Sequence, residues 1–353
     1  MKIRTSPLSD RTRRIRRPCA VACAAALLLL LALRPQRYAA ACAEGIALWA
    51  KVVLPALLPF LVLTAWIARS GMIVGLGRKL SPLLRRCGLP AASAGAFLLS
   101  IVSGYPVGSR VVADLQRRGE IGRAEAERLS ILCSTSGPMF ILGSVGSAMF
   151  GGGKAGAMLL TAHLFGVLAV ALPVLLFRKR PAAAEPSPSP EAQRSAEAAA
   201  LHRLSARAII APQAREPSGT LGETVREAVL SVLCVGGFIA LANVALCAAE
   251  DLLLLAPLRA LAELCLRPFG AQACAEGIVY GLIEATRGCA ALAAAGAAGL
   301  PFAAFAITFG GASILAQQLA FLRPVGVRAG RFIAVKAAQG CAAALFCALL
   351  LAF

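Results

Sequence analysis

The chain has 353 residues, of which 59% are hydrophobic, and it carries a formal net charge of +19. Several apolar stretches reach the roughly 20 residues that span a bilayer, and the mean hydropathy is +0.76. The basic residues stand in short clusters between these stretches, where they orient membrane proteins, which argues against nucleic-acid binding. The 12 cysteines occur singly, without a C-x-x-C pair, and are interpreted as small packing residues. Composition therefore predicts an integral protein of the lipid bilayer, without a metal site or catalytic residues.

The N-terminal region, residues 1–44, is predicted to hold a basic segment and a first transmembrane helix over 19–33. The small residues at 38–43 are compatible with a signal-peptide cleavage region. Arg34 and Arg37 separate the apolar run from these small residues, however. This arrangement favours an uncleaved helix with a cytoplasmic N-terminus.

The next block, 45–177, contains two breaks in apolar segments. Ser103-Gly104-Tyr105-Pro106-Val107-Gly108 cannot continue the preceding helix, because Pro106 lacks a backbone donor and the glycines tolerate turn geometry. A second break follows at Ser134–Pro138. Backbone that leaves a helix at membrane depth persists only inside protein or beside a water-filled cavity. Paired breaks of this kind indicate the binding site of a transporter.

A stretch rich in Pro, Ala, Ser and charge, 178–226, predicts a flexible cytoplasmic linker. The second block, 227–353, repeats the order of the first, with breaks at Glu284–Gly288 and Gly310–Gly311. The positive-inside tendency puts corresponding loops of the two blocks on opposite sides of the membrane, which predicts an inverted repeat. The predicted spans are 19–33, 45–68, 91–118 as a broken hairpin, 131–150, 154–177, 227–248, 253–267, 273–298, 302–322 and 329–353.

Polar side chains at the breaks are the candidates for solute binding. A half-helix that restarts near Val107 would attract a carboxylate, with Arg110 one turn further on; alternatively, Arg110 pairs with Asp114 or reaches the headgroups. Glu284 is a carboxylate inside the membrane, where a charge is energetically costly. It either lines the path of the solute or of a proton, or forms a structural ion pair with Arg287. The candidate residues are Ser103, Gly104, Tyr105, Pro106, Gly108, Arg110, Thr135, Ser136, Gly137, Glu284, Thr286, Ser313 and Gln317.

The hydroxyl groups of the second break suit a polar solute or a sodium ion, although Ser136 can equally cap the following helix. Ser313 and Gln317 are four residues apart and share a helix face, but the glycines before them also permit close helix packing. His163 is expected to hydrogen-bond between helices. No cofactor is expected beyond a coupling ion, either a proton or sodium.

Several motifs resemble the YlbJ-type sporulation integral membrane proteins. They are Leu48-Trp49, the run Val53–Phe60, the Gly-Tyr-Pro break, Ala124–Leu129 before the second break, and Glu284–Gly288, in this order over 45–353 outside the linker. That family carries the nucleoside-recognition (Gate) domain, shared with concentrative nucleoside transporters and the ferrous-iron transporter. The resemblance implies dipicolinate as the solute, moved across the outer forespore membrane during sporulation.

The sequence thus predicts an all-α, multi-pass membrane transporter with two inverted halves, which moves a small anionic or heteroaromatic solute by alternating access. A homo-oligomer is compatible with it. The alternatives are a nucleoside transporter and a non-transporting protein of spore-envelope assembly. An intramembrane hydrolase acting through Ser144 or Ser147 with His163 is disfavoured, because no supporting acidic residue accompanies them, so no enzyme is expected.

Overall fold

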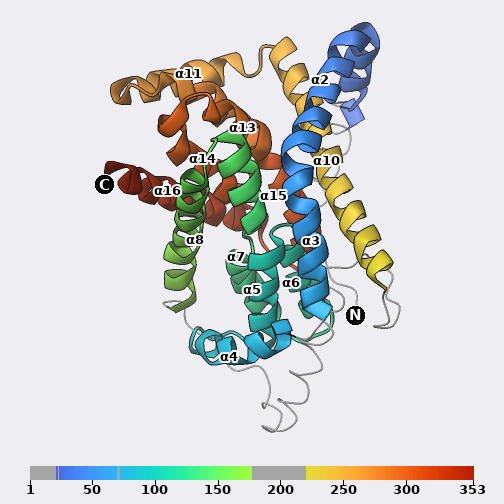
Figure 1. Ribbon diagram of the computed structural model, residues 1–353, viewed down its shortest axis with the longest axis vertical. Helices are drawn as coiled ribbons and strands as arrows, with labels where there is room; N and C mark the ends of the chain where they lie inside the picture. The colour runs from blue at the N-terminus through green and yellow to red at the C-terminus, as the bar shows by residue number, and fades with distance from the viewer. Residues whose placement is uncertain (1–20, 23, 70–71, 177–219) are drawn as a thin grey trace, which may run out of the picture.

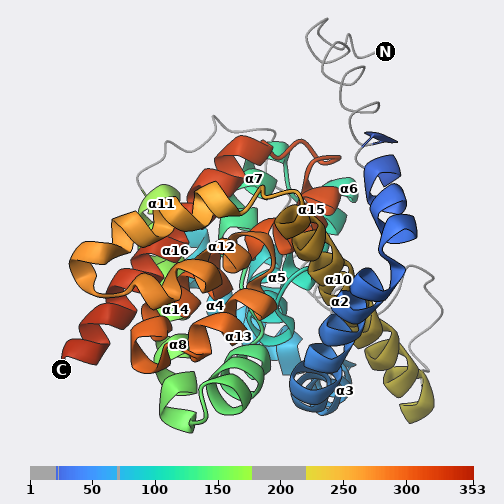
Figure 2. The same ribbon diagram turned by 90° about the horizontal axis from the view of Figure 1, so that it is seen from above.

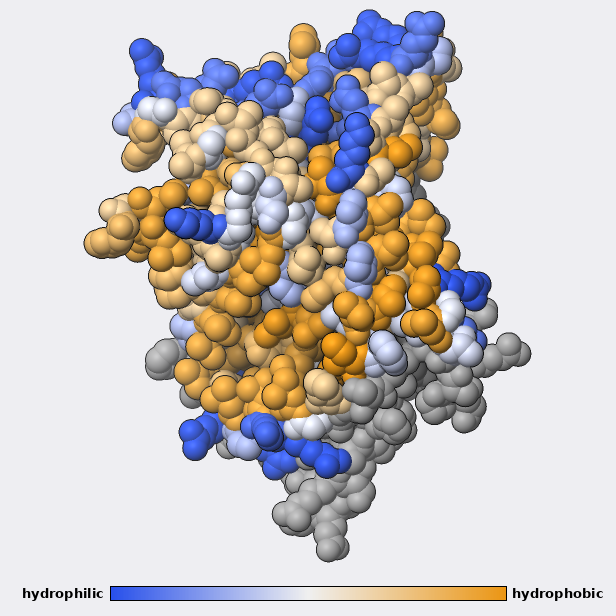
Figure 3. All heavy atoms as spheres, viewed as in Figure 1, coloured by the Kyte–Doolittle hydropathy of each residue, from blue (hydrophilic) through white to orange (hydrophobic). Residues whose placement is uncertain are grey.

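The computed structural model describes residues 21–22, 24–69, 72–176 and 220–353, and every regular element within these ranges is a helix (Figure 1). Apolar residues cover the middle of the visible face and hydrophilic residues gather at its two ends (Figure 3). The described ranges contain 5 helices that are long and apolar enough to cross a membrane: Pro35–Ile67, Gly153–Leu176, Leu221–Asp251, Gly296–Leu322 and Ala329–Ala352. The prediction of an all-α integral membrane protein is confirmed.

The second predicted span begins earlier than expected. α2 (Pro35–Leu48), the π-helical η1 (Trp49–Val53) and α3 (Leu54–Arg69) follow one another without a break, so the helix starts at Pro35 rather than at 45. Proline suits the first helical turn, because its missing N–H has no partner there anyway. Arg34 and Arg37 both form ion pairs with Asp251, at 3.5 and 2.6 Å. Ala24–Leu33 is helical as predicted, and the start of that span lies outside the described residues.

The remaining helices of the first half include one short amphipathic helix and two interrupted pairs. The basic α4 lies at one end of the molecule (Figure 1), and α5 and α6 pack side by side. The bounds are α4 (Met72–Arg86), α5 (Ala92–Ser103), α6 (Val107–Arg117), α7 (Arg123–Leu132), the π-helical η2 (Phe140–Met149) and α8 (Gly153–Leu176).

The second half starts at α10 (Leu221–Asp251), six residues before the predicted boundary at 227. Thr220 and Glu223 form a capping box, which begins the helix there. The rest of the predicted linker, 178–219, lies outside the described residues. The other bounds are α11 (Ala256–Leu266), the 3-10 turns η3 (Arg267–Phe269), η4 (Gln272–Cys274) and η5 (Gly296–Gly299), α12 (Ala275–Ile283), α13 (Ala285–Ala293), α14 (Leu300–Phe309), α15 (Gly311–Leu322) and α16 (Ala329–Ala352).

The two halves share their core. Seen from above, α2, α3 and α10 lie on one side, α8, α14 and α16 on the other, and α5, α12 and α13 between them (Figure 2). One buried cluster joins Leu99 and Leu129 to Leu315. A second joins Ile141 to Ile307. Because each cluster draws on both halves, van der Waals packing of these side chains holds the interrupted helices against one another.

Candidate functional site

The helices are interrupted at all four predicted places. We call Gly104–Pro106 the first break, Cys133–Gly137 the second, Glu284 the third and Gly310 the fourth. They separate α5 from α6, α7 from η2, α12 from α13 and α14 from α15, respectively. Gly104 and Gly310 have φ values of 72° and 90°, which only glycine adopts without strain.

The first and second breaks are in direct contact. The backbone of Gly104 lies so close to Gly137 that a Cβ on Gly104 would overlap the Gly137 amide nitrogen. The Ser100 hydroxyl donates to the Cys133 carbonyl at 2.6 Å, and the Thr135 hydroxyl donates to the Ser100 carbonyl at 2.8 Å. The bond from Ser100 satisfies the Cys133 carbonyl, which the interrupted helix would otherwise leave unpaired in a membrane, whereas the Ser100 carbonyl also accepts from the Gly104 N–H.

His163 on α8 connects the second break to the end of α14. The Ser136 N–H donates to Nε2 at 3.0 Å, so Nδ1 carries the proton and donates to Thr308 Oγ1 at 2.9 Å. The expected interhelical role of His163 is therefore present. Both ring nitrogens are engaged, and neither contacts Ser144 or Ser147. Among the described residues the Ser136 hydroxyl accepts no hydrogen bond from a backbone N–H, so the alternative in which Ser136 caps the next helix is wrong.

Two further sets of hydrogen bonds join the first break to α14, and α6 and the second break to α15. The Tyr105 hydroxyl donates to the Ile307 carbonyl at 2.5 Å, next to the fourth break. The fully buried Gln318 accepts at Oε1 from Ser109, at 3.1 Å, and from the Ser134 hydroxyl. Polar contacts thus join the first, second and fourth breaks into one buried cluster.

The fully buried polar residue of α15 is Gln318, the neighbour of the candidate binding residue Gln317. Ser313 and Gln317 are half-buried, and their side chains hydrogen-bond to none of the residues that the structure describes. The sequence does not distinguish the two glutamines, because apolar residues lie on both faces of this helix and their periodicity does not show which face is buried. The buried face of α15 consists of Gly311, Leu315, Gln318 and Leu322.

The third break is capped by its own side chain. Glu284 is 3% exposed, and its carboxylate oxygens accept from the N–H groups of Thr286 and Arg287 at 3.0 and 2.7 Å. The Arg287 guanidinium pairs instead with Glu44, at 3.5 Å. The alternative of a Glu284–Arg287 ion pair is therefore wrong. Gly311 packs against carbonyl oxygens at the end of α12, which brings the third and fourth breaks together.

The first break, by contrast, leaves the start of α6 uncapped. No side chain in the described part of the chain hydrogen-bonds to its first turn, whose N–H groups have no intrahelical partners. Asp114 pairs with Arg117 at 3.0 Å, so the predicted alternative of an Arg110–Asp114 pair is wrong. Within the described ranges Arg110 has no ion pair, and the buried Ser103 hydroxyl has no hydrogen-bond partner.

Two buried polar residues of α16 were missed from the sequence. The Lys336 ammonium donates to the Ser134 carbonyl at 2.7 Å, and the Gln339 amide donates to the Ile131 carbonyl at 3.0 Å. Both side chains are fully buried. A lysine in an otherwise apolar span was the available signal, since intramembrane charges are usually functional.

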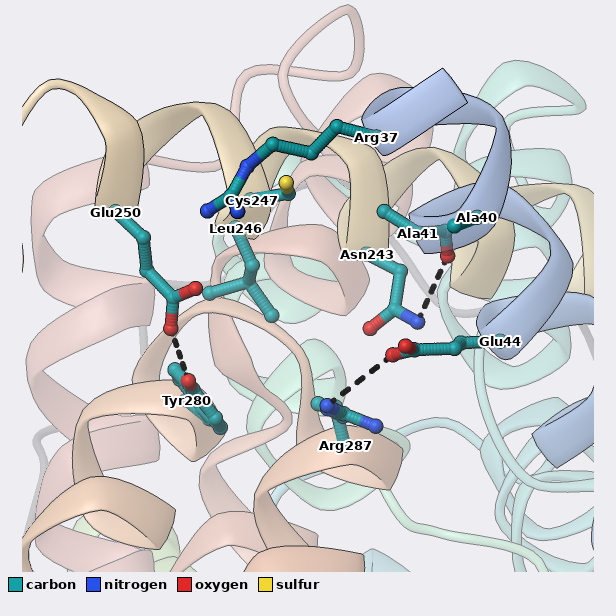
Figure 4. A pocket seen from close by; sticks show the side chains of 10 residues that line it. All are labelled: Arg37, Ala40, Ala41, Glu44, Asn243, Leu246, Cys247, Glu250, Tyr280 and Arg287. Carbon is teal, nitrogen blue, oxygen red and sulfur yellow. Dashed lines mark hydrogen bonds and ion pairs between the residues drawn. The ribbon is translucent and has the colours of Figure 1, made fainter.

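A cavity of about 350 Å³ lies beside the third break, between α2, α10, α12 and α13 (Figure 4). Glu44 and Arg287 pair across it, and Tyr280 donates to Glu250. The side chains of the breaks are buried against one another, so this hollow adjoins the cluster instead of being enclosed by all four breaks. Its lining is Arg37, Ala40, Ala41, Glu44, Asn243, Leu246, Cys247, Glu250, Tyr280 and Arg287.

An ion-pair network joins α7 to the start of α16. Glu127 accepts from Arg328 at 2.8 Å and from Arg331 at 3.3 Å. Partial burial acts to raise the pKa of Glu127, but the hydrogen bond from Arg328 and the charges of both arginines outweigh burial and lower it. The network lies at the α4 end, where the basic residues of both halves gather.

These features define a class: a multi-pass helical membrane protein whose interrupted helices meet in a buried polar cluster. The chain is 32% identical over 217 residues to the sporulation integral membrane protein YlbJ of Bacillus subtilis (strain 168). The match covers 60% of this chain and 51% of that protein, so it spans about half the length of the relative. No family model and no solved structure matches the chain. The similarity confirms the YlbJ-type relationship that the motifs predicted.

Proposed function

We propose that the chain is a carrier for a small anionic or heteroaromatic solute, which it moves across a membrane by alternating access. The observation that carries the proposal is the uncapped start of α6, with the unpaired Arg110 on its next turn, at a place where interrupted helices converge. The N-terminus of a helix and a guanidinium both favour a carboxylate.

The third break supplies an internal comparison. There the Glu284 carboxylate accepts from two backbone N–H groups at the start of α13. The start of α6 presents the same kind of donors without a carboxylate of its own. A carboxylate of the solute would satisfy these donors as Glu284 satisfies those of α13, and Tyr105 beside the break offers a ring for stacking.

The order of elements supports a carrier built from two inverted Gate-like halves, 45–177 and 227–353. Each half has a long helix, a short amphipathic helix, two interrupted pairs and a closing helix. The amphipathic α4 and α11 lie at opposite ends of the molecule, as an inverted arrangement requires (Figure 1). Basic residues gather at the α4 end, which we assign to the cytoplasm together with the N-terminus.

Dipicolinate is the first candidate for the solute, because the chain is similar to a sporulation membrane protein and its family resemblance implies that cargo. The planar ring and two carboxylates of dipicolinate match an aromatic side chain and a cationic helix start. The carrier would act in the outer forespore membrane and perform no covalent chemistry.

Uptake of labelled dipicolinate and labelled uridine into proteoliposomes tests the proposal. We expect dipicolinate uptake that falls about tenfold in Arg110→Ala, the loss of about 1.4 kcal/mol of solute stabilisation. Arg117→Ala is the matched control, because that arginine lies on the same helix but pairs with Asp114. Uptake of uridine alone would establish a nucleoside carrier. Uptake of neither solute by folded protein would refute the proposal and favour a role in spore-envelope assembly.

A further inference from the structure

Lys336 is an unusual residue for the interior of a membrane protein. It lies in the membrane-length helix α16, is fully buried, and forms no ion pair with any acidic side chain in the described part of the chain. A cation away from water is costly unless other groups compensate for it. The compensation at Lys336 comes from backbone oxygen: its ammonium group donates to the Ser134 carbonyl at 2.7 Å.

That carbonyl lies just beyond the C-terminal end of α7, inside the second break. The last carbonyl groups of a helix have no intrahelical partners and carry the negative end of its dipole. Gln339, one turn after Lys336, donates to the Ile131 carbonyl of the same helix end at 3.0 Å. Two side chains of α16 thus donate hydrogen bonds to carbonyl groups at the end of α7, and one of the two, Lys336, is cationic.

A position of this kind binds a metal cation in other carriers. Unwound carbonyl groups and half-helix C-termini hold the coupling sodium ion in transporters built from broken helices, and hard cations prefer such oxygen ligands. The second break offers these oxygens, which is why sodium was one interpretation of its sequence. In the structure a lysine of the protein lies against one of them, the Ser134 carbonyl.

We infer that Lys336 is a tethered cation, whose ammonium group takes the place of a sodium ion at the second break. The carrier therefore binds no sodium there. A sodium ion would cross the membrane with the solute, whereas the charge of Lys336 stays with the protein throughout the cycle. The statement about transport rests on the proposed function, but the statement about the cation site does not.

Thermal unfolding of the full chain in detergent tests the cation site directly. Lys336→Ala removes the charge and leaves space, so we expect a melting temperature lower by about 5 °C. Ethylammonium chloride or sodium chloride should restore about half of this loss, whereas choline chloride at equal ionic strength should not, because choline is too large for the vacated space. The wild-type protein should show no difference among the three salts. Absence of ion-specific recovery in Lys336→Ala would overturn the inference.

Gln339→Ala is the matched control. It removes a buried neutral donor from the same helix end, so it should lower the melting temperature without recovery in any salt. Recovery of this variant by the same ions would show a general salt effect and overturn the inference.

Lys336→Met covers the case in which the alanine variant fails to fold, because methionine keeps most of the side-chain volume. This variant should fold but lose uptake about tenfold, and uptake at the wild-type rate would overturn the inference. Wild-type uptake should be equal in sodium and choline buffers, so stimulation by sodium would also contradict it. If the wild type transports neither tested solute, the proposed function fails, while the unfolding series still decides the cation site.

Discussion

The contact between the first two breaks predicts a large effect for Gly108→Ala. A Cβ at this position would overlap the Cys133 carbonyl oxygen and the Ser100 side chain. Overpacking of this kind costs about 1–3 kcal/mol. Displacing Cys133 also weakens its 2.6 Å bond from Ser100, worth about 1 kcal/mol. The higher helix propensity of alanine returns about 1 kcal/mol. The variant should therefore be about 1–3 kcal/mol less stable than the wild type.

The assay is thermal unfolding of detergent-solubilised protein, followed by the loss of monodisperse material on heating. Gly237→Ala is the matched control, because this glycine is also helical but a Cβ there meets nothing within 4 Å. Helix propensity alone should leave that variant unchanged or slightly more stable. If Gly108→Ala melts at or above the temperature of the wild type, the close contact of the two breaks is refuted.

Three further predictions concern contacts elsewhere in the chain. Gln318→Leu removes the acceptor of two buried hydroxyl groups, so it should lower the free energy of chemical unfolding by about 2 kcal/mol. Gln317→Leu should change this free energy by less than about 0.5 kcal/mol. Equal effects of the two substitutions would contradict the assignment of Gln318 to the buried face of α15. The pKa of Glu127 is lower in the folded protein than in the unfolded chain, so the pairing of its carboxylate with Arg328 should stabilise the protein. This stabilisation should be complete at pH values above the unfolded pKa of about 4.3, and it should be lost as the pH falls through the pKa of the folded protein. Glu127→Gln should flatten this acid limb of a melting-temperature profile, and an unchanged limb would count against the pairing. The Trp49 indole N–H donates to the Val232 carbonyl at 3.0 Å, so Trp49→Phe should lower the free energy of unfolding by about 1 kcal/mol. This loss is measured as a lower unfolding midpoint, and an unchanged midpoint would rule out the hydrogen bond.

The positions of the breaks were predictable because their causes are local. Gly104 and Gly310 have positive φ values, and Pro106 cannot donate to a helix, so the first and fourth breaks are encoded within a few residues. The start of α10 was placed too late, although Thr220 and Glu223 carry a recognisable capping box.

The partners of the charged residues were not predictable from nearby sequence. Asp114 was expected as a partner for Arg110 but pairs with Arg117, three residues on. Arg287 was expected beside Glu284 but pairs with Glu44, on the opposite side of a cavity. The spacing of charged residues along a helix shows which ion pairs are possible within it. Which of these pairs forms depends on how each helix is rotated in the bundle, and so on which other charges lie nearby.

The sequence by itself determined that the chain is an all-α membrane protein, where its helices break and at which end its basic residues gather. Only the tertiary structure decided that Lys336 lies against the Ser134 carbonyl and Gln318 against the Ser134 hydroxyl, across separations of 202 and 184 residues. The physical reason is that lipid is as apolar as a protein core. A membrane helix is therefore hydrophobic on the side that faces lipid and on the side that faces protein, so its periodicity does not show which polar residue points inward.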